Sequence, residues 1–87
     1  MACYIISMDM PAGAEIDPVV EAIKSYGTWA HITESTWAVV SEKDHKQIRD
    51  HILNCLPQNS RIFIVKSGNT AAWNNVICRN EWLKENV

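Results

Sequence analysis

The chain has 87 residues, which suffices for one domain, residues 1–87, with a hydrophobic core limited by its small size. Hydrophobic residues make up 47% and charged residues 21%, which is typical of a globular protein and excludes a disordered chain. Eight Lys and Arg residues against ten Asp and Glu residues give a net charge of −2, which excludes the overall basic excess of a dedicated nucleic-acid-binding domain.

The first predicted element is a strand over residues 2–8 with apolar side chains on both faces. The two sets alternate, with Tyr4, Ile6 and Met8 on one face and Cys3 and Ile5 on the other. A run of this kind is typical of a central strand that is covered on both sides. Asp9 is expected to end the strand, and residues 10–13 form a loop.

A helix and then a hairpin are expected next. Asp17 predicts the helix N-cap with Pro18 at the first helical position, and Gly27 predicts the end of the helix. The following stretch predicts a strand over residues 29–32, a polar turn at 33–35 and a strand over 36–41. In the second strand, Trp37 and Val39 face one way and Ala38 and Val40 face the other.

The second half of the chain predicts three further elements. A helix with an apolar stripe is expected over residues 44–56, because Pro57 cannot continue it. A strand with apolar residues on both faces follows over residues 61–66, and then a turn over 67–69. Thr70 is expected to cap a closing helix that holds Trp73, Val76, Ile77, Trp82 and Leu83.

The order β-α-β-β-α-β predicts an α+β, ferredoxin-like fold with an extra C-terminal helix. Right-handed crossovers give a four-stranded antiparallel sheet with the first and third strands in the centre and two helices on one face. Because three strands are apolar on both faces, the second face needs a cover, which is either the last helix or a second copy of the chain. We favour a homodimer, since small cores often gain stability by association.

The expected interface or binding residues of this homodimer are Tyr4, Ile5, Trp29, Trp37 and Trp73. Tryptophan residues bury large areas, so packing in the core or the interface is the simplest role for the four in this chain. Stacking on exposed nucleobases is the alternative, and it normally requires Lys or Arg between the aromatic residues. No basic residue lies between Thr28 and Val40, which argues against that alternative.

Asp9 is the first candidate for chemistry, because it follows a central strand and precedes a loop. In a symmetric dimer, two Asp9 carboxylates could hold one Mg²⁺ ion that activates water for phosphodiester cleavage. Glu34 and Ser35, at the hairpin turn, could line the same sheet edge and assist as a metal ligand and a hydroxyl donor. The structural alternative is that all three are turn residues, for which Asp and Ser are common choices.

The remaining polar residues suggest little chemistry. Cys3, Cys55 and Cys78 show no C-x-x-C spacing, so we expect reduced thiols in a cytoplasmic protein rather than a disulfide framework or a zinc site. His45 and His51 are six residues apart and do not share a helix face, and His31 is expected to have a structural role. The first apolar run lacks a preceding basic region, which argues against a signal peptide or a membrane span.

The chain resembles the SinR-like group of small phage and bacterial proteins, which is related to the small CRISPR-associated adaptation subunit and to VapD-type ribonucleases. The residues that carry the resemblance are Asp9, Tyr26, Gly27, Trp29, Ile32, Glu34, Ser35, Trp37 and Val39. The resemblance implies a ferredoxin-like fold, a homodimer built on the sheet faces, and Asp9 as a strand-end metal ligand. The relatives carry arginines where this chain has residues 10–13, MPAG, so the fold is expected to transfer better than the activity.

The leading functional hypothesis is a non-enzymatic homodimeric interaction module that binds a macromolecular partner, in a phage or bacterial defence setting that follows from the resemblance alone. Such a module needs no cofactor. The alternatives are a Mg²⁺-dependent endoribonuclease that uses Asp9, Glu34 and Ser35, and a scaffold that binds RNA or DNA without cleavage. The sequence indicates neither a membrane partner nor a small-molecule substrate.

Overall fold

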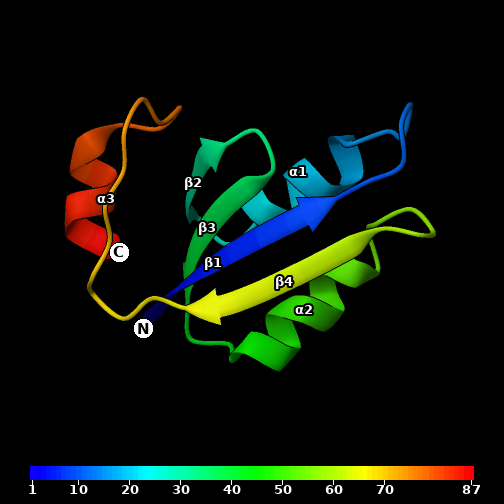
Figure 1. Ribbon diagram of the computed structural model, residues 1–87. Helices are drawn as coiled ribbons and strands as arrows, with labels where there is room; N and C mark the ends of the chain where they lie inside the picture. The colour runs from blue at the N-terminus through cyan, green and yellow to red at the C-terminus, as the bar shows by residue number, and fades with distance from the viewer.

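The computed structural model describes residues 1–87 as one antiparallel sheet with three helices. Figure 1 shows α1 and α2 together behind the sheet and α3 apart from them, beside β2. In chain order the elements are β1 (Ala2–Asp9), α1 (Asp17–Lys24), β2 (Thr28–Thr33), β3 (Thr36–Ser41), α2 (His45–Leu53), β4 (Arg61–Lys66) and α3 (Asn80–Asn86). None of the helices is long and apolar enough to cross a lipid bilayer.

The sheet confirms the predicted α+β, ferredoxin-like fold. Its strand order is β2-β3-β1-β4, so β1 and β3 are central and every neighbouring pair is antiparallel. The register places Ile6 between Trp37 of β3 and Ile64 of β4. Residues directly opposite each other in an antiparallel pair point to the same face, so these three side chains share one side of the sheet.

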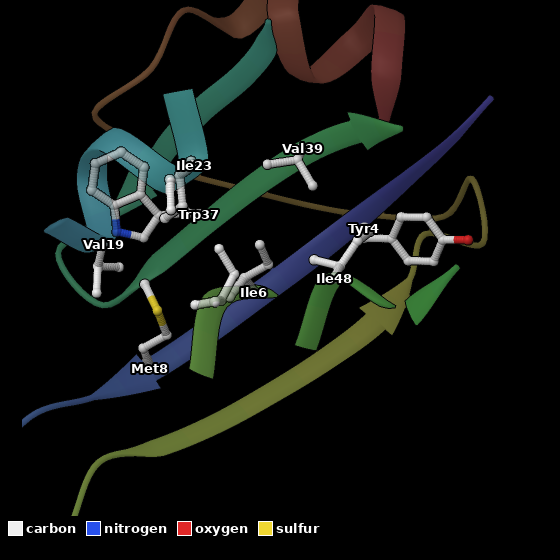
Figure 2. Packing of buried hydrophobic residues seen from close by; sticks show 10 residues of the cluster. Tyr4, Ile6, Met8, Val19, Ile23, Trp37, Val39 and Ile48 are labelled. Carbon is white, nitrogen blue, oxygen red and sulfur yellow. The ribbon is translucent and has the colours of Figure 1, made fainter. Parts of the chain in front are cut away.

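That side is the main hydrophobic core, and α1 and α2 cover it. The most deeply buried side chains are Ile6, Val19, Ile23, Val39, Ile48 and Ile52. Figure 2 shows side chains of β1 and β3 meeting side chains of α1 and α2 in this cluster. Burying each large aliphatic side chain contributes about 1.5–3 kcal/mol, so this layer dominates the stability of the fold.

The first helix begins one residue earlier than predicted. Its N-cap is Ile16, which makes no capping hydrogen bond, and Asp17 lies inside the first turn beside Pro18. A carboxylate in the first turn still interacts favourably with the positive end of the helix dipole. The predicted stop is confirmed: Gly27 has a φ of 85°, a left-handed conformation that glycine adopts without steric cost.

The second helix begins with a capping box, in addition to its predicted apolar stripe. The Asp44 carboxylate accepts a hydrogen bond of 2.8 Å from the Gln47 backbone N–H, and the Gln47 side chain accepts one of 2.9 Å from the Asp44 N–H. This reciprocal pair satisfies donors that a helix start otherwise leaves free. The helix ends at Leu53 rather than Leu56. Before Pro57 the chain tightens into a 3₁₀-type turn, in which the Cys55 and Leu56 N–H groups bond to carbonyls three residues earlier.

The prediction of a long closing helix capped by Thr70 is wrong. Only Asn80–Asn86 is helical, and the chain from Ser67 to Arg79 has no regular structure. Asn69 and Asn75 have φ values of 67° and 56°, which no α-helix accommodates. Asparagine tolerates this left-handed conformation, so the segment follows an irregular path in spite of its helical apolar spacing.

This C-terminal segment, residues 67–87, covers the β2 and β3 half of the second sheet face. The Ile77 N–H donates a hydrogen bond of 2.9 Å to the Ile32 carbonyl of β2, and Leu83 of α3 is only 2% exposed. Ala30 and Ala38 point to this second face and are buried. The chain therefore shields half of the second face by itself.

The rest of the second face is bare along β4 and partly covered along β1, where Cys3 is buried. Phe63 and Val65 of β4 are 66% and 45% exposed, and Ile5 of β1 is half-buried. Ile5 lies directly opposite Val65, and Phe63 is on the same face of the same strand as Val65. We call Ile5, Phe63 and Val65 the bare strip.

Candidate functional site

A hollow of about 580 Å³ lies at the end of β1 and brings together the residues singled out for chemistry. Asp9 of β1, Glu34 and Ser35 of the β2–β3 turn, and Arg61 at the start of β4 all line it. Met8, Met10, Pro11, Gly13, Ala14 and Ile16 complete its wall. We call this the β1-end hollow.

The antiparallel sheet explains why these residues meet. Because β1 and β3 run in opposite directions, the end of β1 lies beside the turn that precedes β3, and the Met8 N–H donates a hydrogen bond of 3.0 Å to the Ser35 carbonyl. On the other side, Asp9 is paired with Arg61 of β4. Asp9 therefore belongs to the strand itself, one residue beyond the predicted strand end.

The electrostatics of the β1-end hollow are mixed. Asp9, Glu34 and Arg61 are all exposed, so two carboxylates and one guanidinium face solvent around it. The structure has no group of three or more His, Cys, Asp or Glu side chains placed to share a metal ion. Asp9 and Glu34 are thus the two carboxylates that this hollow offers to a cation, and water would have to supply the other ligands.

The five residues expected at a dimer interface lie in different places. Tyr4 and Trp37 are buried in the main core, and Trp29 packs against the same core from β2. These three side chains point to the face that α1 and α2 cover, so they are not part of the second face. The alternation of Trp37 with Ala38 predicted which side chains share a face, but not which face the helices cover.

Ile5 and Trp73 do lie on the second face. Both line a small cavity of about 190 Å³ with Ile32 and Leu83, between the sheet and the C-terminal segment. The Trp73 Nε1 donates a hydrogen bond of 3.1 Å to the Asn80 Oδ1, which ties the irregular part of this segment to the start of α3. Trp73 therefore helps the C-terminal segment to pack on the sheet, whereas Ile5 contacts this segment and also belongs to the bare strip.

Sequence reasoning missed two groups of residues. Phe63 and Val65 were not singled out, although the alternation in the RIFIVK run carries the signal for them. In the second group, Lys24 precedes Trp29 and Arg79 precedes Trp82 by only a few residues, which is the local signal for each. The two pairs are far apart in the sequence, and only the fold brings them to one place.

A hydrogen-bonded pair away from these hollows joins the chain just after α1 to α2. The Tyr26 hydroxyl lies 2.7 Å from the His51 Nδ1, and the rings are 5.3 Å apart. Burial, and to a lesser extent the neighbouring Cys55, raises the pKa of Tyr26 above its usual value. His31 has a structural role: its ring stacks on Trp37, and its Nε2 lies 3.2 Å from the Glu34 carbonyl.

The cysteine thiols are all free. Cys3 is buried, and Cys55 and Cys78 are half-buried. Burial raises the pKa of the Cys3 and Cys78 thiols, and a backbone hydrogen bond partly opposes this at Cys78. A raised pKa leaves less reactive thiolate at neutral pH, so neither thiol has the character of a nucleophile.

Comparison of the chain with protein-family models, with curated proteins and with solved structures finds no match in any of the three.

Proposed function

We propose that the protein is a non-enzymatic interaction module that forms a homodimer through the bare strip and then binds a macromolecular partner. The observation that carries this proposal is the exposure of Phe63 and Val65 beside Ile5 on an otherwise covered sheet. Adjacent apolar side chains on two paired strands form a continuous surface, and such surfaces in small proteins often mark protein interfaces.

A second copy of the chain is the occupant that suits the bare strip. The strip spans β4 and β1, and the outer edge of β4 has no neighbouring strand. Arg61 is on the same face of β4 as Phe63 and Val65, whereas Lys66 is on the opposite face. A two-fold axis through the strip places the apolar centre of one copy on the apolar centre of the other, with Arg61 at the rim. The SinR-like resemblance also implies a homodimer built on the sheet faces.

A pair of charged substitutions tests the homodimer. Phe63→Glu places a carboxylate in the centre of the strip and should convert the dimer to a monomer of 9.9 kDa. Leu53→Glu is the matched control, because Leu53 is an exposed apolar residue of α2, outside the strip. Analytical ultracentrifugation of both variants decides: equal masses for the two would overturn the proposed interface.

The partner of the dimer is proposed to be another macromolecule, in the phage or bacterial defence setting of the SinR-like group. Protein and nucleic-acid partners differ in their response to salt, because phosphate contacts release counterions. For a protein partner captured from the native host, binding should persist when the salt concentration rises fourfold. A steep loss of binding would favour the nucleic-acid scaffold instead.

A Mg²⁺-dependent endoribonuclease is the second candidate. The observation that favours it is the convergence of Asp9, Glu34 and Ser35 on the β1-end hollow. Asp9→Asn keeps the size of the side chain but removes its charge, so it should abolish Mg²⁺-dependent RNA cleavage. Glu42→Gln, an exposed acid outside this hollow, should cleave like the unmodified protein. Cleavage that survives Asp9→Asn would reject this candidate.

A further inference from the structure

A second large hollow, of about 480 Å³, lies at the β2 edge of the sheet, between α1 and the C-terminal segment. The indole rings of Trp29, Trp37 and Trp82 line it, and we call it the tryptophan cleft. Its volume is within the range of about 300–1,000 Å³ that small-molecule sites occupy. The bare strip lies at the opposite edge of the sheet, along β4 and the neighbouring β1.

The aromatic wall of the tryptophan cleft is held in place by stacking. The His31 ring lies parallel to Trp37, with 3.8 Å between ring centroids and 8° between planes. Trp29 is tilted against Trp37, with centroids 6.1 Å apart. Trp37 is anchored in the main core and buried, so it holds the half-buried rings of His31 and Trp29 in place, and these two rings present a preorganised surface on which a planar ligand can stack.

The charges around the tryptophan cleft are positive. Lys24 of α1 places its Nζ 5.3 Å from the Trp29 ring centroid, and Arg79 contributes a guanidinium from the C-terminal segment. No carboxylate lines the cleft, although the chain as a whole has a net charge of −2. Two acids lie near Arg79, since Glu81 and Glu85 line a neighbouring small hollow with it. The Arg79 Nε is 3.6 Å from the Glu81 Oε2, but both side chains are largely exposed and such pairs are weak.

No basic residue lies between Thr28 and Val40, but the fold gathers Lys24, which precedes Trp29, and Arg79, which precedes Trp82, around one aromatic cleft. Nucleobases stack on aromatic side chains, and phosphates pair with Lys and Arg. The cleft combines the two features in one place. We propose that the tryptophan cleft binds a nucleotide, with the base stacked on the aromatic wall and the phosphate paired with Lys24 and Arg79.

Titration with three small probes tests both halves of this proposal. AMP carries the ring and the phosphate, adenosine only the ring with its sugar, and ribose 5-phosphate only the phosphate with its sugar. AMP should quench the tryptophan fluorescence with a Kd below about 1 mM, and each of the other two should bind at least about tenfold more weakly. No saturable quenching by AMP, or equal binding of adenosine, would overturn the proposal.

Variants locate the binding. Lys24→Gln should weaken AMP binding about fivefold or more, because it removes one of two cations, whereas Lys46→Gln on the exposed side of α2 should leave it unchanged. Trp82→Leu should weaken it to a similar degree, and its circular dichroism spectrum should match that of the unmodified protein. Equal AMP affinities for Lys24→Gln and Lys46→Gln would place the binding elsewhere and overturn the assignment.

Two sources of the same chemistry remain to be distinguished, a free mononucleotide and a base within a single strand. A hexamer of riboadenylate provides the second arm of the titration. If it binds no more tightly than AMP, the ligand is the free mononucleotide; if it binds much more tightly and with a steep salt dependence, the cleft holds one base of a strand. Phe63→Glu should retain AMP binding in either case, so failure of the homodimer proposal and failure of this one are separable.

Discussion

The second sheet face is covered by the C-terminal segment on one side and exposed to solvent on the other. Over β2 and β3, the C-terminal segment adds a hydrogen bond from Ile77 to Ile32 and buries Leu83 almost completely. Along β4, Phe63 and Val65 remain exposed. The chain therefore covers one part of this face and leaves another part open, and the proposed homodimer depends on the open part.

The largest expected effect is on the covered side. Leu83→Ala removes the buried side chain that anchors α3, and large-to-small substitutions of this kind cost about 2–5 kcal/mol. Urea unfolding followed by circular dichroism measures the loss. A change below about 0.5 kcal/mol, the range of ordinary surface substitutions, would show that α3 does not pack on the sheet in solution.

Phe63→Ala is the matched change on the bare side. At a protein concentration low enough to keep the chain monomeric, it should alter the free energy of unfolding by about 0.5 kcal/mol or less, because the side chain is mostly exposed. The same urea titration applies. A loss as large as that of Leu83→Ala would mean that Phe63 packs within its own chain, and the contrast between the two sides would disappear.

The helix-covered face is a third region, which neither Leu83→Ala nor Phe63→Ala should disturb, and Tyr26→Phe tests it separately. Tyr26→Phe deletes the hydrogen bond to His51, at a cost of about 0.5–1.5 kcal/mol. Because the pKa of Tyr26 is raised in the folded state, its contribution is complete below the ordinary pKa of tyrosine and is lost as the pH rises through the folded pKa. The stability difference between the two proteins should therefore shrink in strongly alkaline solution; a constant difference would contradict this cause.

The smallest effect concerns the thiols. Cys3 points to the second face, is buried and has a raised pKa, so it should be the last of the three cysteines to react with a thiol reagent at neutral pH. Mass spectrometry of partly labelled protein gives the order. Early labelling of Cys3 would indicate that the second face opens readily.

Local signals in the sequence were sufficient for most of the fold. The hairpin with its polar turn, the Gly27 helix stop and the RIFIVK strand all have short-range patterns, and the element order with right-handed crossovers specified β1 and β3 as the central strands. The C-terminal segment was mispredicted because Trp73, Val76 and Ile77 have helical spacing, whereas Asn75 adopts a left-handed conformation. The apolar spacing therefore did not mark a buried helix face: Trp73 and Val76 are half-buried and Ile77 is exposed.

The candidate sites were less predictable, since each is assembled from separate elements. Asp9 and Glu34 were named from their positions at a strand end and a turn, and antiparallel pairing of β1 with β3 brings both to the β1-end hollow. Lys24 and Arg79 each lie close to a tryptophan in the sequence, but their meeting depends on where the irregular C-terminal segment crosses the β2 edge. Sequence patterns describe faces of single elements, and the cleft lies between elements.

The mass of the unmodified protein in solution tests the central claim most directly. Sedimentation equilibrium at several concentrations between 1 and 100 µM, roughly the range in which small interfaces associate, should approach twice the 9.9 kDa of one chain. A mass that stays at that of a single chain throughout would show that the bare strip is left open in the working protein and would contradict the account.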